Sequence, residues 1–539
     1  MSGESLELRR HVPPGCPDER NRSPHTSASR SVPLLSEFRD GAAATCLCAI
    51  VGLVLPLRGL RFHLDARQTE RHRRPVRLKA VVSVVLCALA VVLTACRETR
   101  AVSQGLTEGC GVVSTVADDK APDHVRHVAT EGNDIAGDGS AARPFQTLAR
   151  AARSLSPGTA IYVHAGAYQG GTLLTDIRGT TASPIWISGA PGEPRPIIQG
   201  GGDALHFVRP RYLVIQDLEI RDAASNGINI DDGDEVGNAD AARFVVLRGL
   251  VIHDTGVRPS GVADCLKLAG VNDVTVLHST FGRCGSGPGS GAVGVNGVGV
   301  HRATVAFNRF TANGYGAVQF KGGSDEIDVV GNVMQDTGWR GVNMGGRTSV
   351  AFFRPPPTAS RQNYEAARIR VQANVFVGGE AAVAFTGCVD CEFAHNTVVD
   401  PSKWIVRILQ ENISAGEYAF APASGGRVVD NVFYFRRSDL NTGEDFNVGH
   451  GTNPSSFSVA HNLWYAHDAP RQSSPRIGPV GMDSGSIVGS DPEFVNVDAG
   501  DFHLRSTSAA VGAGDARYTP HADLEGKCYG TPPSLGALR

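Results

Sequence analysis

Short alternations of apolar and polar residues, separated by turn residues, recur along the chain beyond residue 171. Nine segments share one pattern. Two or three apolar residues are followed by a polar position, and apolar and polar residues then alternate. The shared positions are Asp217, Gly249, Ser279, Asn308, Asn332, Asn374, Asn396, Asn431 and Asn462. They are about 31 residues apart on average, and a period of this size indicates a stacked repeat. The repeats show strand patterns without helices, which excludes leucine-rich, ankyrin and tetratricopeptide arrays.

Asparagine occupies most of these shared positions. In a stack of parallel strands, an inward asparagine at the same bend of each coil would bond its neighbours above and below. We therefore expect an amide ladder through the stack. Exposed turn asparagines are the alternative, because asparagine also favours turns.

Each repeat also contains a second strand, in which a glycine is followed by two apolar residues with one residue between them. The apolar pairs are Ile228/Ile230, Leu266/Leu268, Val298/Val300, Val318/Phe320, Val342/Met344, Val383/Phe385 and Val406/Ile408. A second sheet stacked in this way predicts an all-β chain folded as a right-handed parallel β-helix. Closing each strand onto the next coil satisfies the backbone groups and leaves only the two ends open.

The segments at the two ends of the repeats support the same fold. The stretch 127–171 reads as a strand, an Asp/Gly loop, an amphipathic helix around Phe145–Leu155 and a second strand. The motif "GNDIAGDGSAARPFQTLARAARSLSPGTAIYVHAGAY" resembles the entry segment of bacterial parallel β-helix proteins of the pectate-lyase superfamily. The resemblance implies that the helix caps the first coil, and "DPEFVNVDAGDFHLRSTSAAVGAGD" is similar to the terminal segment of many such proteins. We expect the β-helix over residues 124–484 and a C-terminal tail or cap over 485–539.

The first 96 residues have a different character. Residues 76–96 place two positive charges before an apolar run and end in small residues, which is the order of a secretory signal peptide. Their last four residues, "LTAC", resemble the lipobox of bacterial lipoproteins, which implies cleavage before Cys96 and lipidation of that residue. We expect translation to start near Val76, so that residues 1–75 are a doubtful extension. A membrane-spanning leader at 42–57 is the alternative, and residues 97–123 read as a linker.

Composition and cysteine count narrow the function. The net charge of −3 argues against nucleic-acid binding, and 64 glycines with 30 prolines fit many tight turns. Export permits disulfides among the cysteines that follow Cys96. The C-x-x-C pair Cys388 and Cys391 has no second pair at zinc-binding spacing, so a local disulfide or two free thiols are expected.

Alternation in the second sheet turns a set of polar residues outward. The expected files are Asn229, Lys267, Gly299, Gln319, Asn343, Ala384 and Arg407, and beside them Asp231, Ala269, His301, Lys321, Gly345 and Thr386. Coils rise about 4.8 Å each, so Lys267 and Lys321 would lie roughly 10 Å apart. A face of amides and cations suits a linear acidic polysaccharide. Its predicted sugar-binding residues are Asn229, His301, Gln319, Asn343, Arg347 and Arg407.

Two further stretches belong to this face. The insertion 347–365, which contains three consecutive prolines, is expected to form a wall beside it. Asp231, Asp232 and Asp234 could supply oxygen ligands for Ca²⁺, the candidate cofactor. A solvated acidic turn is the alternative interpretation.

Cleavage of a uronate polymer by elimination needs a base and a cation that neutralises the sugar carboxylate. The segment "GVADCLKLAG" resembles the base-bearing strand of calcium-dependent pectate lyases of polysaccharide lyase family nine. That resemblance implies Lys267 as base and the Asp231–Asp234 cluster as metal site, although the gap from Asp264 to Lys267 is shorter than in the family. "KGGSDEIDVVGNVMQDTGWRGVNMGG" is similar to the chondroitinase and alginate-lyase β-helix family, which implies Lys321, but Asn343 stands where that family has an arginine. No pair of outward aspartates supports a polygalacturonase.

The sequence therefore predicts an exported monomer, lipid-anchored to the bacterial cell envelope at the outer membrane or cell surface. It would bind an acidic polysaccharide and, if it is an enzyme, cleave it by β-elimination with Lys267 or Lys321. The alternative is a non-catalytic surface scaffold of the adhesin kind, whose outward lysines are merely solvated.

Overall fold

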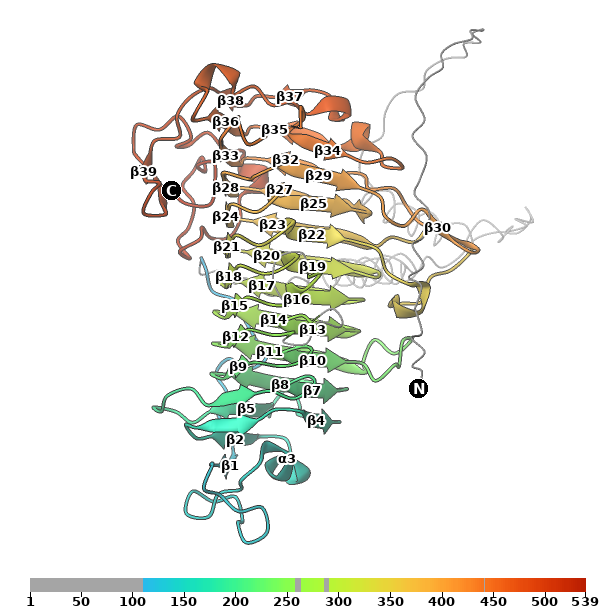
Figure 1. Cartoon of the computed structure of the whole chain (residues 1–539), viewed down its shortest axis with the longest axis vertical. Helices are drawn as coiled ribbons and strands as arrows, with labels where there is room; N and C mark the ends of the chain where they lie inside the picture. The colour runs from blue at the N-terminus through green and yellow to red at the C-terminus, as the bar shows by residue number, and fades with distance from the viewer. Residues whose placement is uncertain (1–109, 257–262, 286–289, 441) are drawn as a thin grey trace, which may run out of the picture. The chain divides into compact units, whose positions relative to one another are not determined.

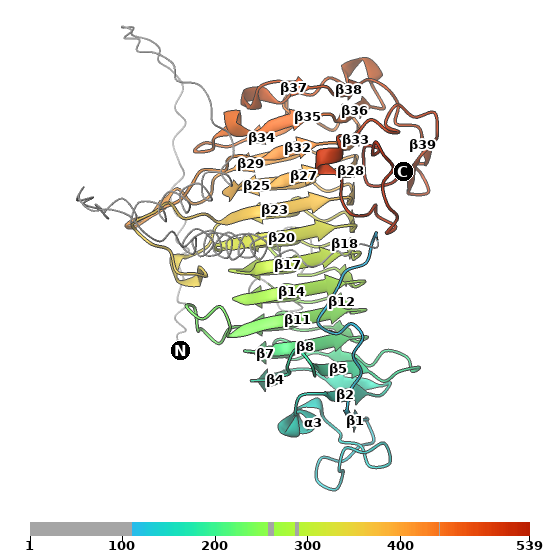
Figure 2. The same cartoon turned by 180° about the vertical axis from the view of Figure 1, so that it is seen from behind.

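The computed structural model describes residues 110–256, 263–285, 290–440 and 442–539. The expected signal peptide, residues 76–96, and the expected lipidation site at Cys96 lie outside the described residues. Three parallel sheets stack their strands one above another (Figures 1 and 2). The described part of the chain is thus a parallel β-helix, as the repeat predicts. No helix among the described residues is long and apolar enough to cross a membrane.

The 14-stranded sheet forms one side of the stack. Its strands in stacking order are β1 (His124–Val128), β2 (Thr159–Val163), β5 (Ile185–Gly189), β8 (Arg211–Gln216), β11 (Ala242–Arg248), β14 (Val271–Leu277), β17 (His301–Ala306), β20 (Ser324–Val330), β23 (Ala366–Gln372), β27 (Glu392–Ala394), β32 (Arg427–Val429), β35 (Ser458–Ala460) and β37 (Asp483–Ser484), with β26 (Cys388–Val389) also paired to β23.

The ten-stranded sheet is the predicted second sheet. Its strands are β4 (Thr172–Thr175), β7 (Leu205–Val208), β10 (Ile228–Asp231), β13 (Leu266–Ala269), β16 (Val293–Val298), β19 (Gly316–Lys321), β22 (Arg340–Gly345), β25 (Val383–Thr386), β29 (Val406–Leu409) and β34 (Phe446–Val448).

The 12-stranded sheet completes each coil. Its strands are β3 (Ala167–Gln169), β6 (Ile197–Gln199), β9 (Glu219–Arg221), β12 (Val251–His253), β15 (Thr280–Gly282), β18 (Arg309–Thr311), β21 (Val333–Gln335), β24 (Val375–Val377), β28 (Thr397–Val399), β33 (Val432–Phe435), β36 (Leu463–Ala466) and β38 (Ile487–Val488). Two antiparallel hairpins lie outside the stack, β30 (Ser414–Ala415) with β31 (Tyr418–Ala419) and β39 (Phe494–Asn496) with β40 (Asp501–Leu504).

Helical structure in the described residues is limited to single turns. The predicted helix is the four-residue α3 (Leu148–Ala151), continued by a 3₁₀ turn at Ala152–Ser154. The Thr147 hydroxyl caps its N-terminus by accepting a hydrogen bond from the Arg150 N–H, and Leu148 and Ala151 join the main core. Further 3₁₀ turns lie at Val350–Phe352, Pro454–Ser456, Pro470–Gln472, Gly478–Val480 and Ala516–Tyr518.

The predicted amide ladder is present where the 14-stranded sheet bends into the 12-stranded sheet. Each side-chain amide from Asn308 to Asn431 donates to the side-chain oxygen of the next asparagine above it, at 2.9–3.0 Å. All members are buried, so each hydrogen bond replaces one that water would otherwise supply. The ladder fixes the register of the coils from Asn308 to Asn462.

The first two predicted ladder positions are wrong by one residue. Asp217 and Gly249 occupy the preceding position, where the backbone has a positive φ of 57° and 62°. The same left-handed position is taken by Phe307, Gly331 and His395 higher in the stack. The next residue, which is the ladder asparagine in the upper coils, is the buried Leu218 or Leu250 in these two coils. The lower coils therefore keep the bend but fill it with apolar side chains.

The C-terminal tail folds back over the outer face of the 12-stranded sheet. Leu535, Ala537 and Leu538 pack there against Val432 and Leu463. A disulfide joins Cys528 of the tail to Cys110, 418 residues earlier in the sequence. Disulfides also join Cys265 to Cys284 and Cys388 to Cys391.

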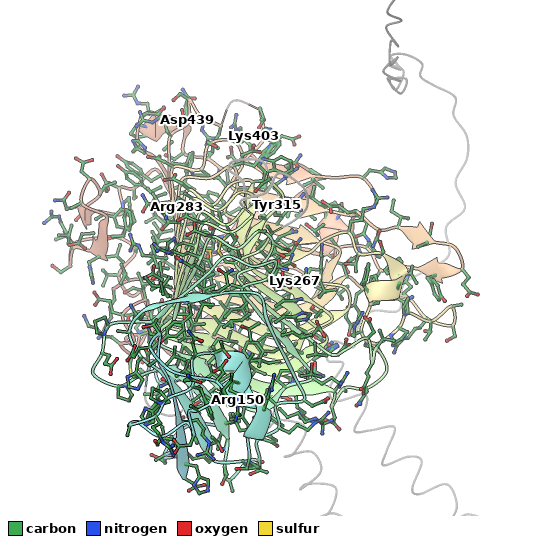
Figure 3. All side chains as sticks on the ribbon, turned by 60° about the horizontal axis from the view of Figure 1, so that its bottom comes forward. Arg150, Lys267, Arg283, Tyr315, Lys403 and Asp439 are labelled. Carbon is green, nitrogen blue, oxygen red and sulfur yellow. A yellow bond between two sulfur atoms is a disulfide. The ribbon has the colours of Figure 1, made fainter. Side chains whose placement is uncertain are left out.

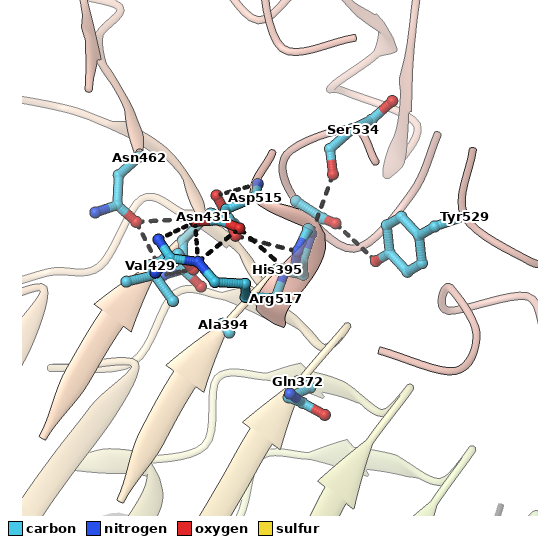
Figure 4. Close-up of polar contacts among 12 residues, drawn as sticks. Gln372, Ala394, His395, Val429, Asn431, Asn462, Asp515, Arg517, Tyr529 and Ser534 are labelled. Carbon is cyan, nitrogen blue, oxygen red and sulfur yellow. Dashed lines mark hydrogen bonds and ion pairs between the residues drawn. The ribbon is translucent and has the colours of Figure 1, made fainter. Parts of the chain in front are cut away.

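A buried polar cluster fastens this tail to the bends of the stack (Figure 4). His395 donates from Nδ1 to the Ser534 carbonyl oxygen at 3.0 Å, and its ring lies 5.0 Å from that of Tyr529. Its Nε2 lies 3.3 Å from the Asp430 carboxylate, whose other oxygen accepts a hydrogen bond from the Asp515 N–H. The cluster places the tail on the side of the stack formed by the 12-stranded sheet and leaves the ten-stranded sheet uncovered by it.

The ladder leads to a stability prediction at its centre. Replacing Asn374 by alanine removes the acceptor of the Asn332 amide and the donor to the Val329 carbonyl, both of them buried. Unsatisfied buried groups cost about 1–3 kcal/mol each, so we expect Asn374→Ala to lower the free energy of unfolding by about 3 kcal/mol or more. Chemical denaturation measures this change.

The matched control for the ladder is Asn238→Ala, because Asn238 lies in an exposed turn. This control should change the free energy of unfolding by less than about 0.5 kcal/mol. Equal effects of the two substitutions would show that the ladder does not stabilise the stack.

Candidate functional site

The outer face of the ten-stranded sheet carries most of the predicted polar residues in register. Strand pairing aligns one file in the order Asn229, Lys267, Asn296, Gln319, Asn343, Ala384 and Arg407. A second file contains Asp231, Ala269, Val298 and Lys321. Lys267 and Lys321 are therefore two coils apart, as predicted, in adjacent files.

The prediction that His301 belongs to this face is wrong. β16 runs through Val298, the chain turns at Gly299 with a φ of 62°, and His301 is the first residue of β17 in the 14-stranded sheet. Val295 and Gly297 are the true partners of Val318 and Phe320, and Asn296 takes the place expected for Gly299. The stretch "VGVNGVGV" alternates valine and glycine in two possible registers, so its pattern could not select one.

A pocket of about 520 Å³ opens over β10, β13 and β19. It brings together seven of the predicted residues, namely Asn229, Asp231, Asp232, Asp234, Lys267, Lys321 and Arg347. The insertion 347–365 forms its wall, as expected, through Thr348, Ser349, Phe352 and Arg354. Figure 3 shows Lys267 among the side chains of this part of the stack.

Lys267 lies at the base of this pocket beside a carboxylate that was not predicted as a site residue. Its Nζ is 3.7 Å from Asp264 Oδ2, and the Asp264 side chain is only 1% exposed. Asp264 accepts hydrogen bonds of 2.8 Å from the Val293 N–H and from the Asn296 amide. Asp264 thereby fixes the floor beside the lysine.

Burial and charge shift the protonation of this pair. Burial lowers the pKa of Lys267; the Asp264 carboxylate opposes this shift, and the positive charge of Lys321 adds to it. Burial likewise raises the pKa of Asp264. Lys267 therefore has a larger neutral fraction at a given pH than an exposed lysine, which is the condition for it to accept a proton.

Two further cations face the pocket. Lys321 lines it from the second file, and no ion pair or side-chain hydrogen bond involves its ammonium within the described residues. Arg347 lies exposed on the wall. The pocket thus combines one lysine of lowered pKa with two cations that are free to meet an anionic ligand.

The three aspartates predicted as calcium ligands are placed differently from one another. Arg354 binds both carboxylate oxygens of Asp232, at 2.8 and 3.0 Å, and both side chains are buried. Asp231 lies 2.5 Å from His206 Nε2, and the Asp234 side chain is 99% exposed. Among the residues that the structure describes, no group of three or more His, Cys, Asp or Glu side chains is arranged to hold a metal ion. As placed, the three aspartates do not offer calcium a shared set of oxygens.

Gln319 and Asn343 face outward as predicted but are buried. Both side-chain amides donate to the Gly345 carbonyl oxygen, at 3.2 and 3.1 Å. Asn343 also accepts hydrogen bonds from the Thr386 hydroxyl and the Arg340 guanidinium. These two residues therefore support the start of the wall and are not exposed for sugar contact, which corrects their predicted role.

Arg407 is the remaining predicted sugar-binding residue, and it lies away from the pocket, toward the C-terminal end of the stack. It is half-buried against the Trp404 ring, with its guanidinium carbon 4.4 Å from the ring centroid. Arg354 belongs to the insertion that the sequence predicts as the wall, but its pairing with Asp232 was not predicted. Its partner, Asp232, is 122 residues distant in sequence, so no local pattern indicated the pair.

Comparison with known proteins finds fold likeness alone. No protein-family model matches the chain, and no curated protein matches it. Similar solved structures include the pectate lyase Pel9A, at 15% identity and a TM-score of 0.42 over 78% of this chain and 97% of that one. A rhamnogalacturonan lyase aligns at 12% identity and 0.37, covering 77% and 96%. An alginate lyase from Paenibacillus sp. aligns at 15% and 0.35, covering 62% and 99%.

The wall of the pocket should depend on the Arg354–Asp232 pair. The Arg354 backbone N–H also donates to the Gly322 carbonyl oxygen, and the Arg354 carbonyl oxygen accepts a hydrogen bond from His301 Nε2. Together with the pair to Asp232, these contacts connect Arg354 to three coils. Removing one partner of a buried ion pair leaves the other charge uncompensated and lowers the free energy of unfolding by about 3–5 kcal/mol. We expect Arg354→Met to increase hydrogen exchange and tryptic cleavage at the exposed Arg361 in the same insertion.

The control for the wall is Arg143→Met, which breaks an exposed ion pair with Asp138 far from the pocket. It should leave protection of the insertion unchanged. Unchanged hydrogen exchange in Arg354→Met as well would contradict the role given to this pair.

Proposed function

We propose that this protein binds an acidic, uronate-containing polysaccharide on the outer face of the ten-stranded sheet and cleaves it by β-elimination. The observation that carries the proposal is the pair of lysines in one open pocket. One of them is half-buried with a lowered pKa, and the other is a cation without an ion-pair partner in the described residues.

In this proposal, neutral Lys267 is the base. Its Nζ takes the proton from C5 of a uronate, the carbon next to the carboxylate. The electron pair left on C5 forms the C4–C5 double bond as the bond from C4 to the glycosidic oxygen breaks. The departing oxygen takes up a proton from water, and Lys267 later returns its proton to solvent.

The other cations lower the barrier to this step. Lys321 and Arg347 face the same space and would hold the uronate carboxylate, on which negative charge grows as the proton leaves. Asp264 positions Lys267 from below without itself lining the cavity. Asn229, which lies beside Lys267 in the same file, would bind a sugar hydroxyl.

A non-catalytic scaffold is the second candidate, and one observation favours it. Gln319 and Asn343 use their amides for internal hydrogen bonds, so part of the predicted sugar-binding file is structural. A scaffold of this kind would bind polymer without turning it over, so turnover separates the two candidates.

Location and partners are part of the same proposal. Cleavage before Cys96 would leave a lipid anchor on an exported protein, and three disulfides suit an oxidising compartment. Helix α3 would close the first coil, and the protein would act as a monomer at the cell envelope. Calcium would need Asp232 to leave Arg354 before it could join the site.

Lys267→Met tests the proposed base. A rise in ultraviolet absorbance, from the unsaturated uronate formed at each new chain end, should follow mixing of the protein with pectate, alginate or chondroitin. We expect Lys267→Met to reduce the rate by roughly 10²–10⁴-fold, the usual contribution of a general base, with polymer binding retained. The exposed Lys527 gives the control variant Lys527→Met. Wild-type binding without turnover on any uronate polymer would favour the scaffold.

Lys321→Met tests how the pKa of the base is set. Loss of the Lys321 charge should raise the pKa of Lys267 from its lowered value. Because the base must be neutral, kcat/KM rises with pH through this pKa, so the rising limb should move to higher pH. KM should also increase, since Lys321 would bind the carboxylate. A rising limb at the same pH as in Lys527→Met would mean that Lys321 does not act on Lys267.

A further inference from the structure

A strip of aromatic and basic residues borders the ten-stranded sheet outside the lysine pocket. We call Tyr315, Trp339, Lys403, Trp404 and Arg407 the aromatic–cation strip. Tyr315 immediately precedes β19, Trp339 immediately precedes β22, and Trp404 lies just before β29. All members therefore belong to the turns that enter this sheet, or to its first residues.

Backbone hydrogen bonds stack these turns directly. The Trp339 N–H donates to the Tyr315 carbonyl oxygen at 2.9 Å, and the Trp404 N–H donates to the Glu380 carbonyl oxygen at 2.9 Å. The Glu380 N–H in turn donates to the Gly338 carbonyl oxygen. The strip therefore spans three coil steps, or about 14 Å along the stack. In Figure 3, Lys267, Tyr315 and Lys403 follow one another along the stack.

The rings of the strip are partly open to solvent. Trp339 as a whole residue is 43% exposed, and its ring centroid lies 5.6 Å from that of Tyr315, with the ring planes at 51°. Large aromatic surfaces normally contribute to stability by burial, so a Trp of this exposure gains little for the fold. Its face is available to a ligand.

Cations accompany the rings. Lys403 Nζ and the Arg407 guanidinium carbon each lie 4.4 Å from the Trp404 ring centroid. Arg407 donates from Nε to the Asn447 side chain, and neither of its Nη nitrogens has a hydrogen-bond acceptor within the described residues. Burial lowers the pKa of Arg407, and the positive charge of Arg340 acts in the same direction. An anion bound beside Arg407 would favour its charged form and so oppose this shift.

A neighbouring buried arginine has spare hydrogen-bonding capacity at the same place. Arg340 is only 6% exposed, and its guanidinium lies 5.4 Å from the Tyr315 ring centroid. It binds Glu411 through Nη2 at 2.8 Å, while its buried Nε has no partner.

We propose that the aromatic–cation strip is a second binding site for the acidic polysaccharide, separate from the lysine pocket. The C–H face of a sugar ring would stack on Trp339, because the slightly positive hydrogens of the sugar would contact the negative face of the indole ring. The sugar carboxylates would bind Arg407, because guanidinium groups bind carboxylates through paired hydrogen bonds, and they would compete for Lys403 with Glu380, whose Oε2 lies 3.6 Å from its Nζ. This inference rests on the proposed function, since it assumes the same class of polymer.

The position of the strip predicts a dependence on polymer length. Tyr315 immediately precedes β19, and Lys321 is the last residue of that strand. The two residues are six positions apart, which corresponds to about 20 Å along an extended strand. A long chain could contact the strip and the pocket together, whereas a disaccharide in the pocket could not reach the strip. The strip would therefore increase affinity for long chains without changing the chemistry.

The test uses the full chain and its Trp339→Ala and Arg407→Gln variants. Retardation in native gels containing pectate, alginate or chondroitin measures binding, and ultraviolet absorbance measures turnover of long polymers and of short oligomers. We expect each substitution to weaken retention by roughly threefold to tenfold and to raise KM on long polymer similarly. Turnover of short oligomers should stay unchanged.

Tyr518→Ala and Arg517→Gln are the matched controls, because Arg517 lies over the Tyr518 ring on the C-terminal tail. Their retention should equal that of the wild type. Undiminished retention of both strip variants, with wild-type turnover intact, would overturn the strip and leave the proposed function standing. Weakened retention without wild-type turnover would support the strip and remove only the elimination reaction. No retention of the wild type on any of these polymers would overturn both.

Discussion

The register of the parallel coils is the constraint on which the other features of this structure depend. The amide ladder from Asn308 to Asn462 holds that register at one bend, through buried hydrogen bonds that lose their partners if any coil slips. Side chains alternate between the two faces of a strand, so a slip of one residue would exchange core and surface. Lys321 belongs to a coil within the ladder, whereas Lys267 lies one coil below it, where the Ser279 N–H donates to the side-chain oxygen of Asn308 and so ties that bend to the ladder.

The fold could be predicted because each coil repeats the same local pattern. The ladder asparagines and the apolar pairs recur at a spacing that only a stacked architecture explains. The prediction failed where the pattern was degenerate. The lower coils replace the ladder with Leu218 and Leu250, and the valine–glycine repeat before His301 permits two registers. Only the pairing of β16 with β19 distinguishes them.

The candidate site was predictable to the extent that it follows from strand alternation. That rule placed Lys267, Lys321 and Asn229 on one face, and the structure gathers them in one pocket. The rule says nothing about what covers a face. Gln319 and Asn343 are buried and donate to the Gly345 carbonyl oxygen at the end of β22, and Arg354 of the insertion binds the Asp232 carboxylate that a calcium ion would need. Contacts between residues so distant in sequence depend on how the insertion folds back onto the coils.

Catalysis in the lysine pocket is best tested by the crystal structure of Lys267→Met soaked with uronate oligomers of pectate, alginate and chondroitin in turn. We expect a sugar in the pocket over β10, β13 and β19, with its carboxylate on Lys321 and Arg347 and the C5 hydrogen directed at residue 267. Oligomers that bind only on another sheet, or in the pocket with the carboxylate turned away from both cations, would contradict it.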